Sequence, residues 1–128
     1  MYQTDYILRM IEQVGTLLRR MLDALRVARP EEALQIADEA VLVVTDTPPE
    51  LIDALGPEGV VQFFAAGGQL DLERAVLLAH VLHGRATAFE ELGKDSKADA
   101  QREKADALLA AAREIDEDRV EALLDMLE

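Results

Sequence analysis

Apolar residues recur at every third or fourth position through most of the chain, beginning near its N-terminus. Between about residues 4 and 28 the apolar positions are Ile7, Met10, Ile11, Val14, Leu17, Leu18, Met21, Leu22 and Leu25. This is the spacing of one apolar face on an amphipathic helix. The row continues over three heptads, a length at which a helix can also pair with another copy of itself. The pattern therefore predicts a long helix that is either part of the core or the seam of a dimer.

Proline and threonine mark where the next helices begin. Pro30 suits the first turn of a helix predicted over 31–44, because the N–H that proline lacks would be unpaired there. The apolar side of this helix consists of Ala33, Leu34, Ala37, Ala40, Val41 and Val44. The segment Thr47-Pro48-Pro49-Glu50 matches a capping box with Thr47 as the N-cap. We therefore predict short, irregular helices over 47–68.

The second half of the chain predicts a helical hairpin followed by one more helix. A long helix is expected from about 70 to 92, with Gly93 as the residue that ends it. Asp95 or Ser96 would cap the returning helix, which extends to about 113, and Asp116 would cap a last helix over 116–127. We therefore predict one all-α domain over residues 1–128, a bundle of six to seven helices arranged as antiparallel hairpins.

Composition and charge exclude several functional classes. The chain has 128 residues, half of them hydrophobic, which is enough for the core of one domain. It contains no cysteine, which excludes disulfides, thiolate nucleophiles and cysteine-ligated zinc. The net charge of −13, with acidic residues spread through both halves, disfavours nucleic acid as a partner. The one basic cluster, Arg19, Arg20, Arg26 and Arg29, is interpreted as a solvated face near a helix end.

The sequence also indicates a cellular location. No apolar run approaches the roughly 20 residues that a membrane-spanning helix needs. The first nine residues lack the charged start and the apolar run of a signal peptide. We therefore expect a cytoplasmic protein that does not bind a membrane. Arginine outnumbers lysine, and alanine and leucine are abundant, which favours a bacterial source.

The hairpin over 70–113 resembles a tetratricopeptide repeat, a helix-turn-helix unit of about 34 residues. Small and aromatic residues match at Ala86, Phe89, Gly93, Ala98 and Ala105. Two features depart from the pattern, because Arg102 occupies an aromatic position and no proline closes the unit. A fainter match, at Ala33 and Ala40, lies 65 residues earlier, against about 68 for two repeats. The resemblance implies a tetratricopeptide-like bundle, and the alternative is an ordinary antiparallel hairpin with a tight crossing.

The chain also resembles a family of short, all-helical bacterial proteins without an assigned function. Members of that family open with a segment similar to Tyr6-Ile7-Leu8-Arg9-Met10-Ile11-Glu12-Gln13 and end in a tetratricopeptide-like hairpin. The resemblance implies a helical fold and a bacterial origin. It implies no catalytic residue.

Histidines offer the one candidate metal site. His80 and His83 lie three positions apart, on adjacent turns of one helix. A di-iron Glu-x-x-His pair would need a carboxylate at position 77 or 80, where the chain has leucine and histidine. No phosphate-binding glycine loop and no nucleophile motif is present, and Ser96 is the only serine. We therefore predict no enzyme activity, no cofactor and no bound metal, with His80 and His83 as the alternative for a metal-binding or small-molecule-binding bundle.

The remaining hypothesis is a non-enzymatic protein-interaction or scaffolding module that forms a homodimer. The proposed partner-binding residues are Ile7, Met10, Val14, Leu17 and Met21 along the first helix, and the aromatic pair Phe63 and Phe64. Adjacent helix positions point about 100° apart, so one of the two phenylalanines is expected in the core. Burial of both in the core is the favoured arrangement; if one is exposed, it is the candidate anchor for a peptide or a partner helix.

Overall fold

The computed structural model describes residues 2–127, with side chains from residue 5 onward, as an all-helical bundle without strands. Met1 and Glu128, the end residues of the predicted domain, lie outside the described residues. The helices are α1 (Tyr2–Arg26), α2 (Pro30–Thr45), α3 (Pro49–Ala54), α4 (Pro57–Phe63), α5 (Leu72–Glu91) and α6 (Asp95–Leu127). The predicted all-α bundle is confirmed. None of these helices combines the length and the apolar character needed to cross a bilayer.

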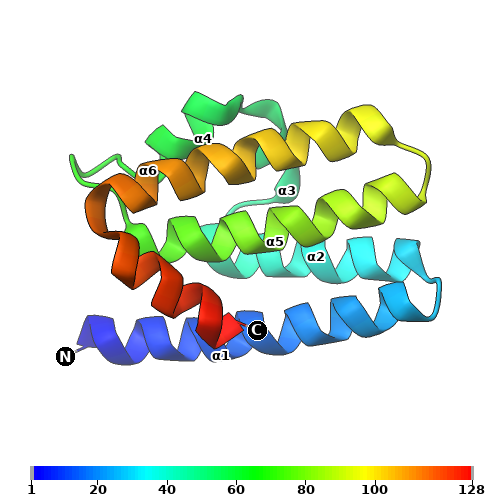
Figure 1. Ribbon diagram of the computed structural model, residues 1–128, viewed down its shortest axis with the longest axis horizontal. Coiled ribbons are helices and arrows are strands. Elements are labelled where there is room, and N and C mark those ends of the chain that lie inside the picture. Colours follow the sequence, from blue (N-terminus) through cyan, green and yellow to red (C-terminus); the bar gives the residue numbers. More distant parts are fainter. Residues whose placement is uncertain (1, 128) are drawn as a thin grey trace.

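The four long helices lie side by side in the order α1, α2, α5 and α6; the short helix α4 lies beside α6, and α3 contacts α2 (Figure 1). Contacts join α1 to α2, α2 to α5, and α5 to α6. Beyond Asp116 the chain of α6 turns back across the bundle and contacts α1. This return packs the end of α6 against α1, and the buried side chains of the long helices form one main core.

The turn in α6 follows from one residue. Asp116 has φ −159° and ψ 93°, which interrupts the helix. Its carboxylate accepts the backbone N–H of Arg119 at 3.0 Å, so Asp116 caps the segment that follows. The predicted last helix is thus present, joined to the preceding helix by a kink.

The turn between α5 and α6 has the geometry expected of a glycine ending. Gly93 has φ 76°, in the left-handed region that favours glycine. Its N–H donates to the carbonyl of Glu90 at 3.0 Å, and the N–H of Lys94 donates to the carbonyl of Phe89 at 2.9 Å. These two bonds form a Schellman motif. The sequence prediction at Gly93 is confirmed.

The predicted capping box at Thr47 is wrong. Helix α3 begins one residue later than that motif requires, after Pro48, and no side chain caps it. The Thr47 hydroxyl instead pairs with the Thr45 hydroxyl at 2.9 Å, and Thr45 Oγ1 also donates to the carbonyl of Val41 at 2.8 Å. Thr47 therefore belongs to the polar end of α2.

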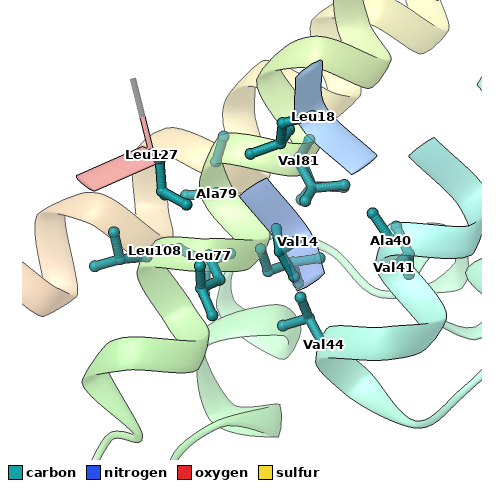
Figure 2. Close-up of a cluster of buried hydrophobic side chains, with 14 of the residues drawn as sticks. Val14, Leu18, Ala40, Val41, Val44, Leu77, Ala79, Val81, Leu108 and Leu127 are labelled. Carbon is teal, nitrogen blue, oxygen red and sulfur yellow. The ribbon is translucent and has the colours of Figure 1, made fainter. Parts of the chain in front are cut away.

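The core consists almost entirely of aliphatic side chains from the long helices. Figure 2 shows Val14 of α1 near Val44 of α2 and Leu77 of α5, and Leu18 of α1 near Val81 of α5. Helix α5 is buried on most sides because α1, α2 and α6 all pack against it. One contact is so close that a Cβ atom at Gly84 would overlap the end of the Met21 side chain. The Met21 side chain of α1 therefore packs directly against the Gly84 backbone of α5, although glycine is a poor residue in the middle of a helix.

The end of α1 repeats the Schellman hydrogen bonds but has alanine at the left-handed position. Ala28 has φ 57°, and the N–H of Arg29 donates to the carbonyl of Ala24 at 2.8 Å. We expect Ala28→Gly to raise the free energy of unfolding by about 0.5–1 kcal/mol, because relief of backbone strain outweighs the greater freedom of the unfolded chain. Urea denaturation measures this change in the free energy of unfolding. The control, Ala110→Gly in the exposed middle of α6, should lower stability by about 1 kcal/mol. Equal losses in both variants would contradict this account.

Candidate functional site

A charged side chain lies deep in the bundle, on α5. Arg85 is only 4% exposed. It occurs three residues after Leu82 and four before Phe89, so the helical repeat places it on the buried side of α5. Its guanidinium lies over the Phe89 ring, 5.2 Å from the ring centroid. A cation buried in this way requires partners that compensate for its lost hydration.

Three other helices supply those partners. The Nε–H of Arg85 donates to Asp38 of α2 at 2.9 Å. The two terminal nitrogens donate to the two carboxylate oxygens of Asp53 in α3, at 2.6 and 3.0 Å, a bidentate pair. Nη1 also donates to the side-chain oxygen of Gln101 in α6 at 3.0 Å. One guanidinium thus joins α2, α3, α5 and α6.

Two further hydrogen bonds complete what we call the Arg85 cluster, formed by Asp38, Asp53, Arg85, Gln101 and Lys104. The Gln101 amide donates to the Asp53 carboxylate at 3.1 Å, and Lys104 Nζ donates to the Asp53 backbone carbonyl at 3.3 Å. Two cations and two carboxylates balance in charge. Every buried side-chain nitrogen and oxygen in the described part of the chain has a hydrogen-bond partner. The cluster is therefore internally satisfied.

The two carboxylates of the cluster differ in pKa. Burial raises the pKa of Asp38 above its ordinary value, even though the charge and hydrogen bond of Arg85 oppose this. Burial acts in the same direction on Asp53, but the hydrogen bonds and charge of Arg85, with help from Gln101 and Lys104, outweigh it and lower the pKa of Asp53. The bidentate pair accounts for the difference, because Asp38 accepts a single bond from Arg85.

The cations of the cluster respond to the same surroundings. Burial tends to lower the pKa of Arg85, but the two aspartates prevail and raise it. Burial, together with the charge of Arg85, lowers the pKa of Lys104. Arg85 therefore remains charged, and the other side chains of the Arg85 cluster are held in hydrogen bonds or ion pairs. This arrangement suits a structural joint between helices better than acid-base chemistry, which needs a group that is free to exchange a proton.

None of the five cluster residues is among the site residues predicted from the sequence. The available signal was Arg85 itself, because a charged residue interrupts an otherwise apolar stripe on the helix predicted over 70–92. Its partners could not be identified in this way, since they lie 47, 32 and 16 positions from it.

The residues predicted to bind a partner lie mostly inside the single chain. Those that its own helices cover are Met10, Val14, Leu17, Met21 and Phe64. Ile7 and Phe63 are partly buried against the same core. The two phenylalanine rings meet edge to face, with centroids 5.2 Å apart. Phe64 is thus in the core, whereas Phe63 is only partly buried, so the favoured expectation that the core buries both is not met. The apolar row of α1 is thus occupied by α2, α5 and α6, and it leaves no free seam.

The two histidines lie on α5. His80 is partly buried, and His83 Nε2 lies 3.3 Å from a carboxylate oxygen of Asp106. In the part of the chain that the structure describes, no three histidine, aspartate or glutamate side chains are arranged to hold a metal ion. The metal-binding alternative therefore gains no third ligand from the fold.

A shallow surface hollow of about 630 Å³ lies where the start of α1, the start of α5 and the kinked part of α6 meet. Its lining includes the exposed side chains of Tyr6 and Leu8. Arg74 donates to the Tyr6 hydroxyl at 3.0 Å, and Arg119 lies 3.6 Å from Glu73. The arginines of the hollow are therefore already paired with groups of the chain itself, and its lining mixes polar and apolar side chains.

Charge is divided unevenly between α1 and the rest of the molecule. Residues 1–29 carry five arginines and three carboxylates, a net charge of +2, whereas residues 30–128 carry 8 basic and 23 acidic side chains, a net charge of −15. The outer side of α1 consists of the exposed residues Asp5, Tyr6, Leu8, Arg9, Glu12, Gln13, Thr16, Arg19, Arg20, Leu22, Asp23 and Arg26. Leu22 is 50% exposed there, among arginines. This surface carries four arginines and three carboxylates, a net charge of +1, and it is partly apolar.

Comparisons with protein-family models, curated proteins and solved structures find no match to this chain. The all-helical fold is thus established by the structure, and the two family resemblances rest on the sequence patterns alone.

The Arg85 cluster gives opposite pH effects for its two aspartates. The lowered pKa of Asp53 means that its charge stabilises the fold above its ordinary pKa, and that this contribution is lost as the pH falls through the folded value. We expect Asp53→Asn to cost about 1 kcal/mol near pH 7, after allowing for the partial exposure of the carboxylate, and progressively less at acidic pH.

The raised pKa of Asp38 means that its ionised form opposes folding, and that this penalty is relieved as the pH falls through the folded value. Asp38→Asn should therefore be most favourable near neutral pH and should lose this advantage in acid. Urea denaturation between about pH 3 and pH 7 measures both variants, with the exposed Asp99→Asn as a control whose effect should vary little. Parallel pH profiles for Asp38→Asn and Asp53→Asn would refute the assignment.

Proposed function

We propose that this chain is a non-enzymatic protein-interaction module that associates with itself through the outer side of α1. The observation that carries the proposal is the division of charge, +2 on residues 1–29 against −15 on the remainder. A basic surface on an otherwise acidic molecule attracts acidic protein surfaces and repels basic ones.

The exposed apolar residues on the same side of α1 support this proposal. Leu8 and Leu22 point into solvent between the arginines of α1. Arginine and apolar side chains together are typical of the contact regions of protein interfaces. Single exposed leucines are ordinary on protein surfaces, so the division of charge supports self-association more strongly than these leucines do.

The interior of the bundle supports a non-enzymatic role. Its largest polar constellation, the Arg85 cluster, is satisfied by groups of the chain itself. The alternative, a metal-binding or small-molecule-binding bundle that uses His80 and His83, has no observation of comparable weight in its favour.

We also propose the cellular setting and the type of helical hairpin that the sequence predicts. That setting is a bacterial cytoplasmic protein with a tetratricopeptide-like α5–α6 hairpin. Ala86, Ala98 and Ala105 are fully buried at the crossing of this hairpin, as small residues are in such repeats. Arg102, at the position of an aromatic, instead pairs with Glu90 at 2.6 Å.

Self-association makes a direct prediction about mass in solution. At high micromolar concentration and physiological salt, we expect a mass twice that of the 14.1 kDa chain. Salt screens charges that lie more than a Debye length apart, but oppositely charged groups of two copies in direct contact lie closer together than this and still attract each other. Sedimentation equilibrium measures the mass without labels. A mass that stays at 14.1 kDa at every concentration would contradict the proposal.

A further inference from the structure

The molecule itself carries a surface that complements the outer side of α1. Residues 114–126, which we call the acidic C-terminal segment, contain six carboxylates and one arginine, a net charge of −5. Two large apolar side chains are exposed on this segment, Ile115 at 58% and Met126 at 51%. The segment is thus the acidic counterpart of α1, with apolar residues among the charges.

Each of the two surfaces has charged side chains that are available for an outside partner. Arg20 makes no hydrogen bond or ion pair with another described residue, and Arg19 contacts only the Thr16 hydroxyl at 3.3 Å. On the acidic C-terminal segment, Asp118 and Asp125 are exposed and have no such partner within the described chain. Each surface therefore presents charges that the fold does not neutralise.

Self-repulsion restricts how two copies can meet. Each copy carries a net charge of −13, so most relative orientations bring like charges together. Salt reduces this repulsion beyond about 8–10 Å, and the groups in direct contact then decide the outcome. An orientation that places the outer side of α1 against the acidic C-terminal segment joins charges of opposite sign.

Both surfaces belong to elements that contact each other. The acidic C-terminal segment descends from the left end of α6 to the middle of α1, whereas the second half of α1 extends to the α1–α2 turn at the right (Figure 1). Arg19 and Arg20 lie in that second half. A two-fold rotation about an axis near the middle of α1 exchanges these two ends.

We propose that two copies of the chain pair around such a two-fold axis. The arginines in the second half of α1 contact the acidic C-terminal segment of the partner copy, and the same contact is formed twice. The inference rests on the proposed self-association and names the surfaces that carry it. A two-fold contact closes on itself, so it produces a dimer and no larger assembly.

Charge reversal tests the pairing. The first variant carries Arg19→Glu and Arg20→Glu. Neighbouring helix positions point about 100° apart, so these two substitutions reverse the charge at both edges of the outer side of α1. The second carries Asp118→Arg and Asp125→Arg, seven positions apart and so on one side of the helix. A control, Lys94→Glu with Lys97→Glu at the α5–α6 turn, changes the net charge as the first variant does but lies outside both surfaces. Circular dichroism verifies that all variants are folded.

Sedimentation equilibrium then measures each variant alone and the first two mixed in equal amounts. We expect each of the first two variants alone to dissociate at least about tenfold more readily than the wild type, because like charges then face each other or attraction is lost. The mixture should restore the dimer, since each contact in the mixed pair again joins opposite charges. The control should dimerise as the wild type does.

The outcomes separate this inference from the proposed function. A wild-type chain that stays monomeric would overturn both. A wild-type dimer that survives either charge reversal, or a mixture that fails to restore it, would overturn the pairing and leave self-association standing. An assembly larger than a dimer would overturn the two-fold arrangement in favour of a head-to-tail contact.

Discussion

The guanidinium of Arg85 joins four of the six described helices through direct hydrogen bonds. Helix α3 depends on it most, because a helix of six residues has little stability of its own. Asp53 of α3 is held by two bonds to Arg85 and one to Gln101, and Ile52 beside it is fully buried. Removing one partner would leave the others incompletely paired, which costs more than the net gain of forming such a pair. The cluster therefore determines where α3 lies between α2 and α6.

This use of the interior bears on function. Aliphatic packing and the Arg85 cluster fill the space between the long helices, so the bundle keeps its polar groups for its own stability. The surfaces open to other molecules include the shallow hollow beside Tyr6, the outer side of α1 and the acidic C-terminal segment. The kink at Asp116 connects two of these, because it directs the acidic C-terminal segment back to α1. A single capping residue thus places oppositely charged surfaces on neighbouring elements.

The sequence predicts local features well and long-range ones poorly. Helical spacing identifies the long helices, and Gly93 and Asp116 mark true breaks because their backbone conformations are locally determined. The role of the Met10 to Met21 row stayed open, since the same spacing serves a core helix and a dimer seam; the structure shows that α2, α5 and α6 cover it. The N-cap predicted at Thr47 is wrong because the Thr47 hydroxyl instead forms a hydrogen bond with the Thr45 hydroxyl. The Arg85 cluster depends on residues from four helices, and no local pattern contains that information.

A double-mutant cycle between Arg85 and Asp53 tests most directly whether the buried guanidinium holds the helices together. The cycle compares Arg85→Met, Asp53→Asn and the double variant by urea denaturation, with a second cycle through Asp38→Asn. The account predicts a coupling energy of about 1–3 kcal/mol between Arg85 and Asp53, and a smaller one with Asp38, which accepts a single hydrogen bond. Effects that add to within about 0.5 kcal/mol in the Asp53 cycle would contradict it.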